Sequence, residues 1–332
     1  MPIIMTMLLS TALLLIETFS QDAAPRGPVI NLSFDDSAAR YVLEHPASAL
    51  ENERDTIWKT FEGYRITLVW HKESSFPVTW EIWEKGLNRF LEDTLLIRRT
   101  LELADSLKSK AQKEKNSIAK HISAYLAAAA PITASVYFVA FTTPYAFCVE
   151  RNKIGIDITG DEWNFDTDCV LNTVIHEIFH VGYRATTPDL EYLQSEPGDE
   201  ETLLHFCYAY LQSEGMATYV GYKALDLYPS DYRHDDYELL EEDSKVLRAI
   251  GQMGVLLEDA GSVAIDSMLQ EVWDIGVTER AFYVAGAYMA KTIEEKHGTE
   301  YLARLTGKGG LQFTREYNAI VPDEYRIILK EL

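Results

Sequence analysis

The residues of this chain best suited to chemistry lie together in the segment VIHEIFHVGY, residues 174–183. At its centre, His176 and His180 are four residues apart, and Glu177 directly follows the first histidine. On an α-helix, residues four apart differ by only about 40° around the axis, so the two imidazoles point the same way. Converging imidazoles are ligands that a tetrahedral zinc ion takes in proteins. The spacing therefore predicts two ligands of a zinc site.

Glu177 lies beside both histidines, where its carboxylate would reach a water on the metal rather than the metal itself. Zinc lowers the pKa of such a water toward ~7, and a nearby carboxylate can take its proton as the water attacks a carbonyl. This is the chemistry of the H-E-x-x-H motif. The competing interpretation is a helix without metal, which would leave the nitrogens of two imidazoles unsatisfied among apolar residues.

The third zinc ligand must come from a later part of the chain. A third histidine ten residues after the first is excluded, because that position is Thr186, and Tyr183 replaces the glycine that accompanies this arrangement. The remaining candidates are Glu191, Glu196, Glu200, Glu201, His205 and Glu214. The first three lie in a polar loop, which would hold a ligand poorly.

Glu214 is favoured as the third ligand by its neighbours and by helix geometry. Gly215 and Ala217 are small, so the helix that carries Glu214 can approach another helix closely, as a shared metal requires. His205 precedes Glu214 by nine residues, about 180° around a helix, so only one of the two can face the metal. We therefore predict one zinc ion with its fourth position left for water.

Hydrophobic spacing predicts the elements that position these residues. Apolar residues recur at helical spacing in segments 78–91 and 95–130, so residues 21–130 should form a largely helical N-terminal lobe. Residues 134–141 and 153–160 are predicted strands. The motif helix should be capped by Thr167 or Asp168 and end near Tyr183. Further helices follow, so residues 131–332 are predicted as the catalytic region, with the sheet and motif helix in 131–185 and a helical lobe in 186–332.

Composition limits the partners and the location of the protein. The formal net charge is −22 with no basic stripe to offset it, so nucleic acid is not expected as a partner. Residues 1–20 are typical of a signal peptide, because their apolar run is too short to span a membrane. We expect export without stable membrane insertion after cleavage, with a retained N-terminal anchor as the alternative. Cys148, Cys169 and Cys207 match no zinc-thiolate spacing, and a disulfide between the first two stays open.

The motif helix, followed by a helix with Glu214-Gly215-x-Ala217, resembles the gluzincin metallopeptidases. It is similar to uncharacterised bacterial families of zinc-dependent peptidases. The resemblance covers residues 134–310 and implies an α+β fold that is mostly helical, with a zincin-like core of small sheet, motif helix and C-terminal helical lobe. The implied activity is that of a zinc metallopeptidase with a peptide or protein substrate.

The segment FYVAGAYMAKTIEEKHG is similar to the Tyr-x-x-Gly helix of gluzincin aminopeptidases. By this resemblance Tyr283, three residues before Gly286, would donate a hydrogen bond to the oxyanion of the tetrahedral intermediate. His234 is the alternative donor. Two features depart from that family: the gap from His180 to Glu214 is longer, and residues 153–160 lack the Gly-x-Met-x-Asn signature. Aminopeptidase activity is therefore not implied.

The sequence thus predicts peptide-bond hydrolysis in which Glu177 acts as general base and then passes the proton to the leaving amine. A peptide would bind along Ile154 to Thr159 as an added strand. The alternative is a catalytically inactive zinc-binding module that binds peptides or another partner. A helical interaction protein without metal is a third interpretation.

Overall fold

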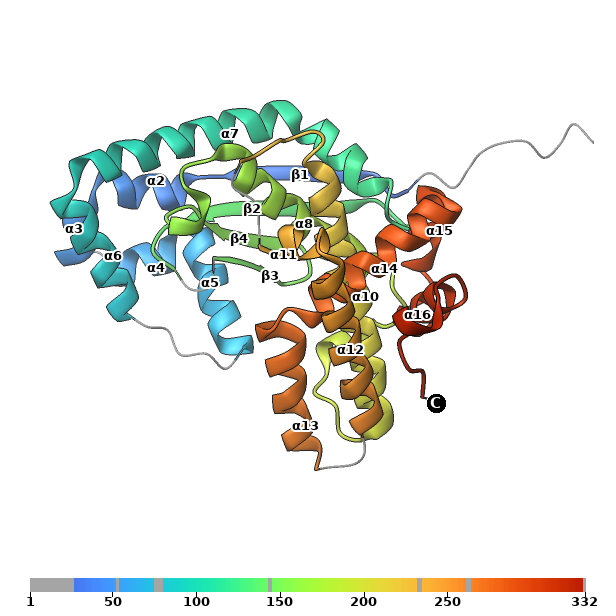
Figure 1. The fold of residues 1–332 in the computed structure, drawn as a ribbon. Helices are drawn as coiled ribbons and strands as arrows, with labels where there is room; N and C mark the ends of the chain where they lie inside the picture. Colours follow the sequence, from blue (N-terminus) through green and yellow to red (C-terminus); the bar gives the residue numbers. More distant parts are fainter. Residues whose placement is uncertain are drawn as a thin grey trace, which may run out of the picture.

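The computed structural model describes residues 27–51, 54–74, 80–142, 145–231, 235–260 and 264–330 of the chain. The predicted signal peptide, residues 1–20, and His234 lie outside these described residues. The described chain is a mostly helical α+β protein with a four-stranded sheet, which confirms the predicted fold class (Figure 1).

The sheet has the strand order β1-β2-β4-β3. Its strands are β1 (Ile30–Asp35), β2 (Ile132–Val139), β3 (Ala146–Val149) and β4 (Lys153–Asp157). β1, β2 and β4 are parallel, whereas β3 pairs antiparallel with β4 and forms one edge of the described sheet. Since β1 pairs with β2, residues from both sides of position 130 share a single sheet.

The N-terminal helices cover the sheet and surround one of its ends. They are α2 (Ser37–Glu44), α3 (Pro46–Glu51), α4 (Arg54–Thr60), α5 (Glu62–Glu73), α6 (Trp80–Glu92) and α7 (Thr94–Ser123). The long α7 runs across the sheet beside β1 (Figure 1). It begins where the Asp93 side chain accepts hydrogen bonds from the backbone N–H groups of Leu95 and Leu96, which satisfies two donors of its first turn.

The motif helix is α8 (Thr167–Thr186), which packs between the sheet, α7 and α10. Its N-cap is Asp166, whose side chain accepts hydrogen bonds from the N–H groups of Asp168 and Cys169. The predicted caps, Thr167 and Asp168, were therefore wrong by one and two residues, because Asp166 also has a side chain suited to capping. The short 3-10 helix η1 (Asp161–Trp163) connects β4 to α8.

The C-terminal part is entirely helical in the described residues. It comprises α9 (Leu190–Gln194), α10 (Glu200–Ala224), α11 (Asp235–Leu240), α12 (Asp243–Asp259), α13 (Ile265–Glu271), η2 (Val272–Thr278), α14 (Ala281–His297), α15 (Thr299–Leu305), α16 (Gly310–Asn318) and η3 (Asp323–Tyr325). The buried α10 packs against the motif helix α8 on one side and against α14 on the other.

Two glycines allow α10 and α14 to touch through their backbones. A Cβ atom added at Gly215 would lie 2.3 Å from the Cα of Gly286. A Cβ atom added at Gly286 would lie 2.2 Å from the carbonyl oxygen of Leu211. The small residues next to Glu214 thus permit a close helix crossing, but with α14 rather than with α8, the helix that carries the two histidines.

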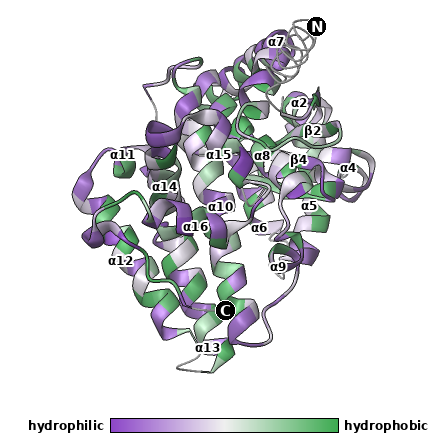
Figure 2. Cartoon of the chain, turned by 90° about the vertical axis from the view of Figure 1, so that its right-hand side faces the viewer, coloured by the Kyte–Doolittle hydropathy of each residue, from purple (hydrophilic) through white to green (hydrophobic). Residues whose placement is uncertain are grey.

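The outer helices are amphipathic rather than uniformly apolar. In α12, the buried residues include Val246, Ala249, Ile250 and Met253, which recur at helical spacing on one face. Figure 2 shows the resulting mixture of hydrophilic and hydrophobic residues along this helix. Among the described residues, none of the helices combines the length and hydrophobicity that crossing a membrane requires.

Candidate metal centre

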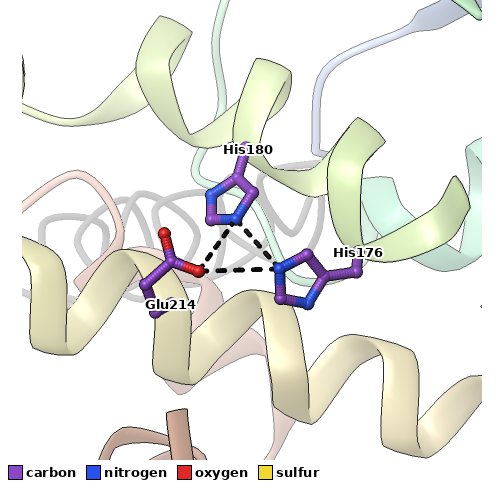
Figure 3. Close-up of side chains that lie close together, drawn as sticks. All are labelled: His176, His180 and Glu214. Carbon is purple, nitrogen blue, oxygen red and sulfur yellow. Dashed lines mark hydrogen bonds and ion pairs between the residues drawn. The ribbon is translucent and has the colours of Figure 1, made fainter. Parts of the chain in front are cut away.

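Helices α8 and α10 bring His176, His180 and Glu214 to one point (Figure 3). The two histidine Nε2 atoms are 3.1 Å apart. Glu214 Oε2 lies 3.2 Å from Nε2 of His180 and 3.6 Å from Nε2 of His176. The helices run in opposite directions here, since His180 meets Ser213 and Glu214 while Tyr183 donates a 2.8 Å hydrogen bond to Gln212.

The separations of these three donor atoms fit a zinc ion. Ligand atoms at about 2.0–2.1 Å from a tetrahedral zinc are separated from each other by about 3.3 Å. The three separations of 3.1, 3.2 and 3.6 Å bracket this value. Two imidazoles and one carboxylate are also a ligand set that catalytic zinc takes in proteins. The side chains present therefore match the ion in donor type and in spacing.

Ser213 orients the second histidine ring. Its hydroxyl oxygen lies 3.1 Å from His180 Nδ1. When Nδ1 carries the proton and donates it to this oxygen, Nε2 presents a lone pair toward Glu214 and His176. No sequence pattern singles out Ser213, because its role depends on the antiparallel packing of two helices.

Burial and charge act against each other in the triad. Burial favours the neutral form of Glu214, but the charge and hydrogen bond of His180, together with those of His176, outweigh it and lower the pKa of this carboxyl. Burial likewise lowers the pKa of His180, and the negative charge of Glu214 more than reverses this effect. Glu214 is thus held as a carboxylate, the form that binds a cation.

Glu177 extends from α8 toward the edge strand β3. Cys148 Sγ on β3 lies 3.3 Å from Glu177 Oε2 and 3.2 Å from the Glu177 carbonyl oxygen, so the thiol can donate to either. Burial is the largest of the causes that raise the pKa of the Cys148 thiol well above its usual value, and the negative charge of Glu177 is the next. Cys148 therefore remains a neutral thiol beside the carboxylate, a contact that the sequence did not predict.

Tyr283 of α14 lies on the other side of the triad. Its ring is nearly parallel to that of His176, with 6.4 Å between the centroids and 12° between the planes. Burial raises the pKa of the Tyr283 hydroxyl well above its usual value, and the negative charge of Glu214 adds a smaller effect in the same direction. No hydrogen bond joins the Tyr283 hydroxyl to another described residue, so this group can donate to a ligand.

An arginine packs over the face of the Tyr283 ring. The guanidinium carbon of Arg280 lies 3.2 Å from the ring centroid. Asp236, which is 2% exposed, accepts hydrogen bonds of 2.9 and 2.5 Å from Arg280. Arg280 adopts a left-handed backbone conformation with φ of 66°, rare for a residue with a side chain, at the start of α14. Tyr283 is therefore packed against an arginine that is itself held by Asp236.

The other candidates named from the sequence lie elsewhere. Four glutamates are exposed: Glu191, Glu196, Glu200 and Glu201. His205 stacks on Tyr192 with 4.3 Å between the ring centroids, away from Glu214 on the same helix. Cys169 and Cys207 are buried, and all three described cysteines are thiols rather than disulfides.

The predicted location of the bound peptide was wrong. The segment Ile154 to Thr159 was expected to form an edge, but β4 pairs with β2 on one side and with β3 on the other. Backbone groups used in this way cannot pair with a peptide as well. The edge strand is β3, whose four residues were too few to be recognised from their pattern.

A family model described as "Putative zinc dependent peptidase (DUF5700)" matches residues 81–323. The match includes all three residues of the triad together with Glu177, Arg280 and Tyr283. No curated protein and no solved structure matches the chain significantly.

Proposed function

The chain belongs to this family, which is described as "Putative zinc dependent peptidase", and we propose that it hydrolyses peptide bonds with one zinc ion bound by His176, His180 and Glu214. The observation that carries the proposal is the convergence of three zinc-type donors at zinc-type separations, with Glu177 next to the first of them. A purely structural zinc site would need no carboxylate directly beside its first histidine.

The residues of the chain divide the reaction between them. Zinc bound there supplies a Lewis acid that lowers the pKa of a water to about 7 and polarises a carbonyl. Glu177 accepts the proton of the attacking water and passes it to the leaving amine. Cys148 keeps the carboxylate of Glu177 directed by donating to it. Tyr283 donates to the oxygen that becomes negatively charged.

The edge strand β3 provides a way to align the substrate. It carries Cys148, which contacts Glu177, so its free edge runs beside the proposed base. An extended peptide that pairs with this edge would bind through backbone hydrogen bonds, which are independent of peptide sequence. The scissile carbonyl would thereby be presented to the triad.

Zinc loading tests the proposed function. The protein stripped of metal by a chelator should lose peptide hydrolysis, and one equivalent of zinc per chain should restore it. Isothermal titration gives the stoichiometry, and fluorogenic peptides give the rate. The variant His205→Ala removes an imidazole from the other side of α10 and should behave like the wild type. Stoichiometric zinc binding with no hydrolysis across a peptide library would instead favour the inactive peptide-binding module.

Replacing Tyr283 with phenylalanine should lower kcat by about 10²- to 10³-fold, the usual cost of removing one oxyanion donor. KM and zinc affinity should change little, because the phenylalanine ring keeps the contacts with Arg280 and His176. Tyr288→Phe is the matched control on the same helix, since Tyr288 packs against Tyr325 instead. An unchanged kcat in Tyr283→Phe would remove this residue from the mechanism.

A further inference from the structure

Arg184 lies one helical turn beyond the triad on the motif helix. It follows His180 by four residues and Glu177 by seven, so all three project from one face of α8. Arg184 therefore projects from the face of α8 that carries the metal ligands, one turn beyond His180.

Arg184 has no acidic partner in the described part of the chain. Neither an ion pair nor a hydrogen bond to its guanidinium is found there, although the side chain is half-buried. This is unexpected in a protein with 52 acidic and 30 basic residues, where a carboxylate is seldom far away. A half-buried guanidinium has five N–H donors, and their desolvation is offset only when an acceptor binds them.

Tyr210 offers a second unused donor at the same end of the site. It precedes Glu214 by four residues, hence it lies on the Glu214 side of α10, one turn away. Because α8 and α10 are antiparallel, one turn back along α10 corresponds to one turn forward along α8. The ring of Tyr210 is held by Phe206, with centroids 4.4 Å apart, and by Trp273, at 5.8 Å. Its hydroxyl makes no hydrogen bond to another described residue.

We propose that Arg184 and Tyr210 form a substrate subsite that binds a carboxylate of the peptide. This inference rests on the proposed peptidase function and adds the chemical class of substrate to it. A guanidinium binds a carboxylate through paired hydrogen bonds, and a neighbouring phenol can donate a further one. The carboxylate would come either from the C-terminus of the peptide or from an aspartate or glutamate side chain.

Helix and strand dimensions set the position of this carboxylate in the substrate. Arg184 lies about 6 Å along α8 from His180 and about 10 Å from Glu177, at 1.5 Å of rise per residue. An extended peptide advances about 3.3 Å per residue. The bound carboxylate should therefore be two or three residues from the bond that is cut.

The test compares acetylated octapeptides that share one sequence and differ in a single group. In one pair, the first peptide ends in a free carboxylate and the second in an amide. In each further pair, one peptide has Glu and the other has Gln at the same internal position. Equilibrium binding is measured on zinc-loaded Glu177→Gln protein, so the readout does not depend on turnover. In one of these pairs, the peptide with the carboxylate should bind about 10- to 100-fold more tightly than the peptide with the amide. That pair shows whether the bound carboxylate is the C-terminus or a side chain.

The variant Arg184→Gln, made in the same Glu177→Gln protein, should abolish this preference while leaving the affinity for the uncharged peptides unchanged. Arg184→Lys should retain part of it, because the charge remains and the paired geometry is lost. Arg98→Gln on α7 is the matched control for loss of one positive charge, since this side chain is 70% exposed. It should keep the full preference.

Three outcomes would overturn the subsite: equal affinity for charged and uncharged peptides, a preference that survives in Arg184→Gln, or no binding of any peptide. A different result would contradict the proposed peptidase function: zinc-loaded wild-type protein that binds these peptides and cleaves none of them. Selective carboxylate binding that requires Arg184 would in that case still support the subsite.

Discussion

Replacing Glu177 with glutamine should lower kcat for peptide hydrolysis by about 10²- to 10⁴-fold, the usual contribution of a general base. The zinc content should remain one ion per chain, because Glu177 is not among the three converging donors. Glutamine has nearly the same size, and its amide oxygen can still accept a hydrogen bond from Cys148. The variant therefore keeps the packing around α8 and loses the ability to take a proton.

The measurement is a comparison of kcat, bound zinc and melting temperature between the variant and the wild type. Glu191→Gln is the matched control, since Glu191 is an exposed glutamate on α9. It should leave all three quantities unchanged. Hydrolysis by Glu177→Gln at the wild-type rate would show that another group activates the water.

Replacing Glu214 with alanine should weaken zinc binding by at least about 100-fold and thereby abolish hydrolysis at low zinc concentrations. Loss of a group that only orients a ligand already costs about 10- to 100-fold in metal affinity, and loss of a ligand should cost more. The carboxylate is the single negatively charged donor of the triad, and its Oε2 lies within 3.6 Å of both imidazoles. Two neutral imidazoles would remain.

Competition with a chromophoric chelator gives the affinity, and hydrolysis at increasing zinc concentrations shows whether activity returns with the metal. Glu201→Ala removes an exposed glutamate from the same helix and serves as the control. Zinc affinity unaltered in Glu214→Ala would mean that a different residue completes the site.

The three converging donors could be predicted from sequence because each inference used geometry within a single helix. The spacing of His176 and His180 fixes their common direction on any α-helix. The nine residues between His205 and Glu214 decided which of them could face the histidines, and the structure places His205 against Tyr192 instead. Small residues beside Glu214 indicated a close approach to the helix that shares the metal, but the structure uses Gly215 to approach α14.

Contacts between distant segments could not be predicted in the same way. The parallel pairing of β1 with β2 joins residues about one hundred positions apart, and nothing in residues 30–35 specifies that partner. β3 has only four residues, too short a segment for alternation to reveal a strand. Without β3, neither the contact of Cys148 with Glu177 nor the true edge of the sheet could be foreseen.

The environment of Tyr283 shows the same limit. A resemblance to a known helix motif suggested this residue, but the support from Arg280 and Asp236 depends on how α11 meets the start of α14. The left-handed conformation of Arg280 has no signal in the sequence, because such conformations are usually occupied by glycine or asparagine. Tertiary packing decides both features.

The crossing of α10 and α14 limits which residues the backbone beside the metal centre can carry. Gly215 follows Glu214 directly and Gly286 lies one turn after Tyr283, so the contact between the two glycines sets how far the carboxylate is from the phenol. A single methyl group at Gly286 would meet a backbone oxygen at 2.2 Å and would push the helices apart by about 1 Å. Displacements of this size can reduce catalysis about 100-fold. Two residues without functional groups thus set the spacing of the two side chains that the proposed mechanism uses.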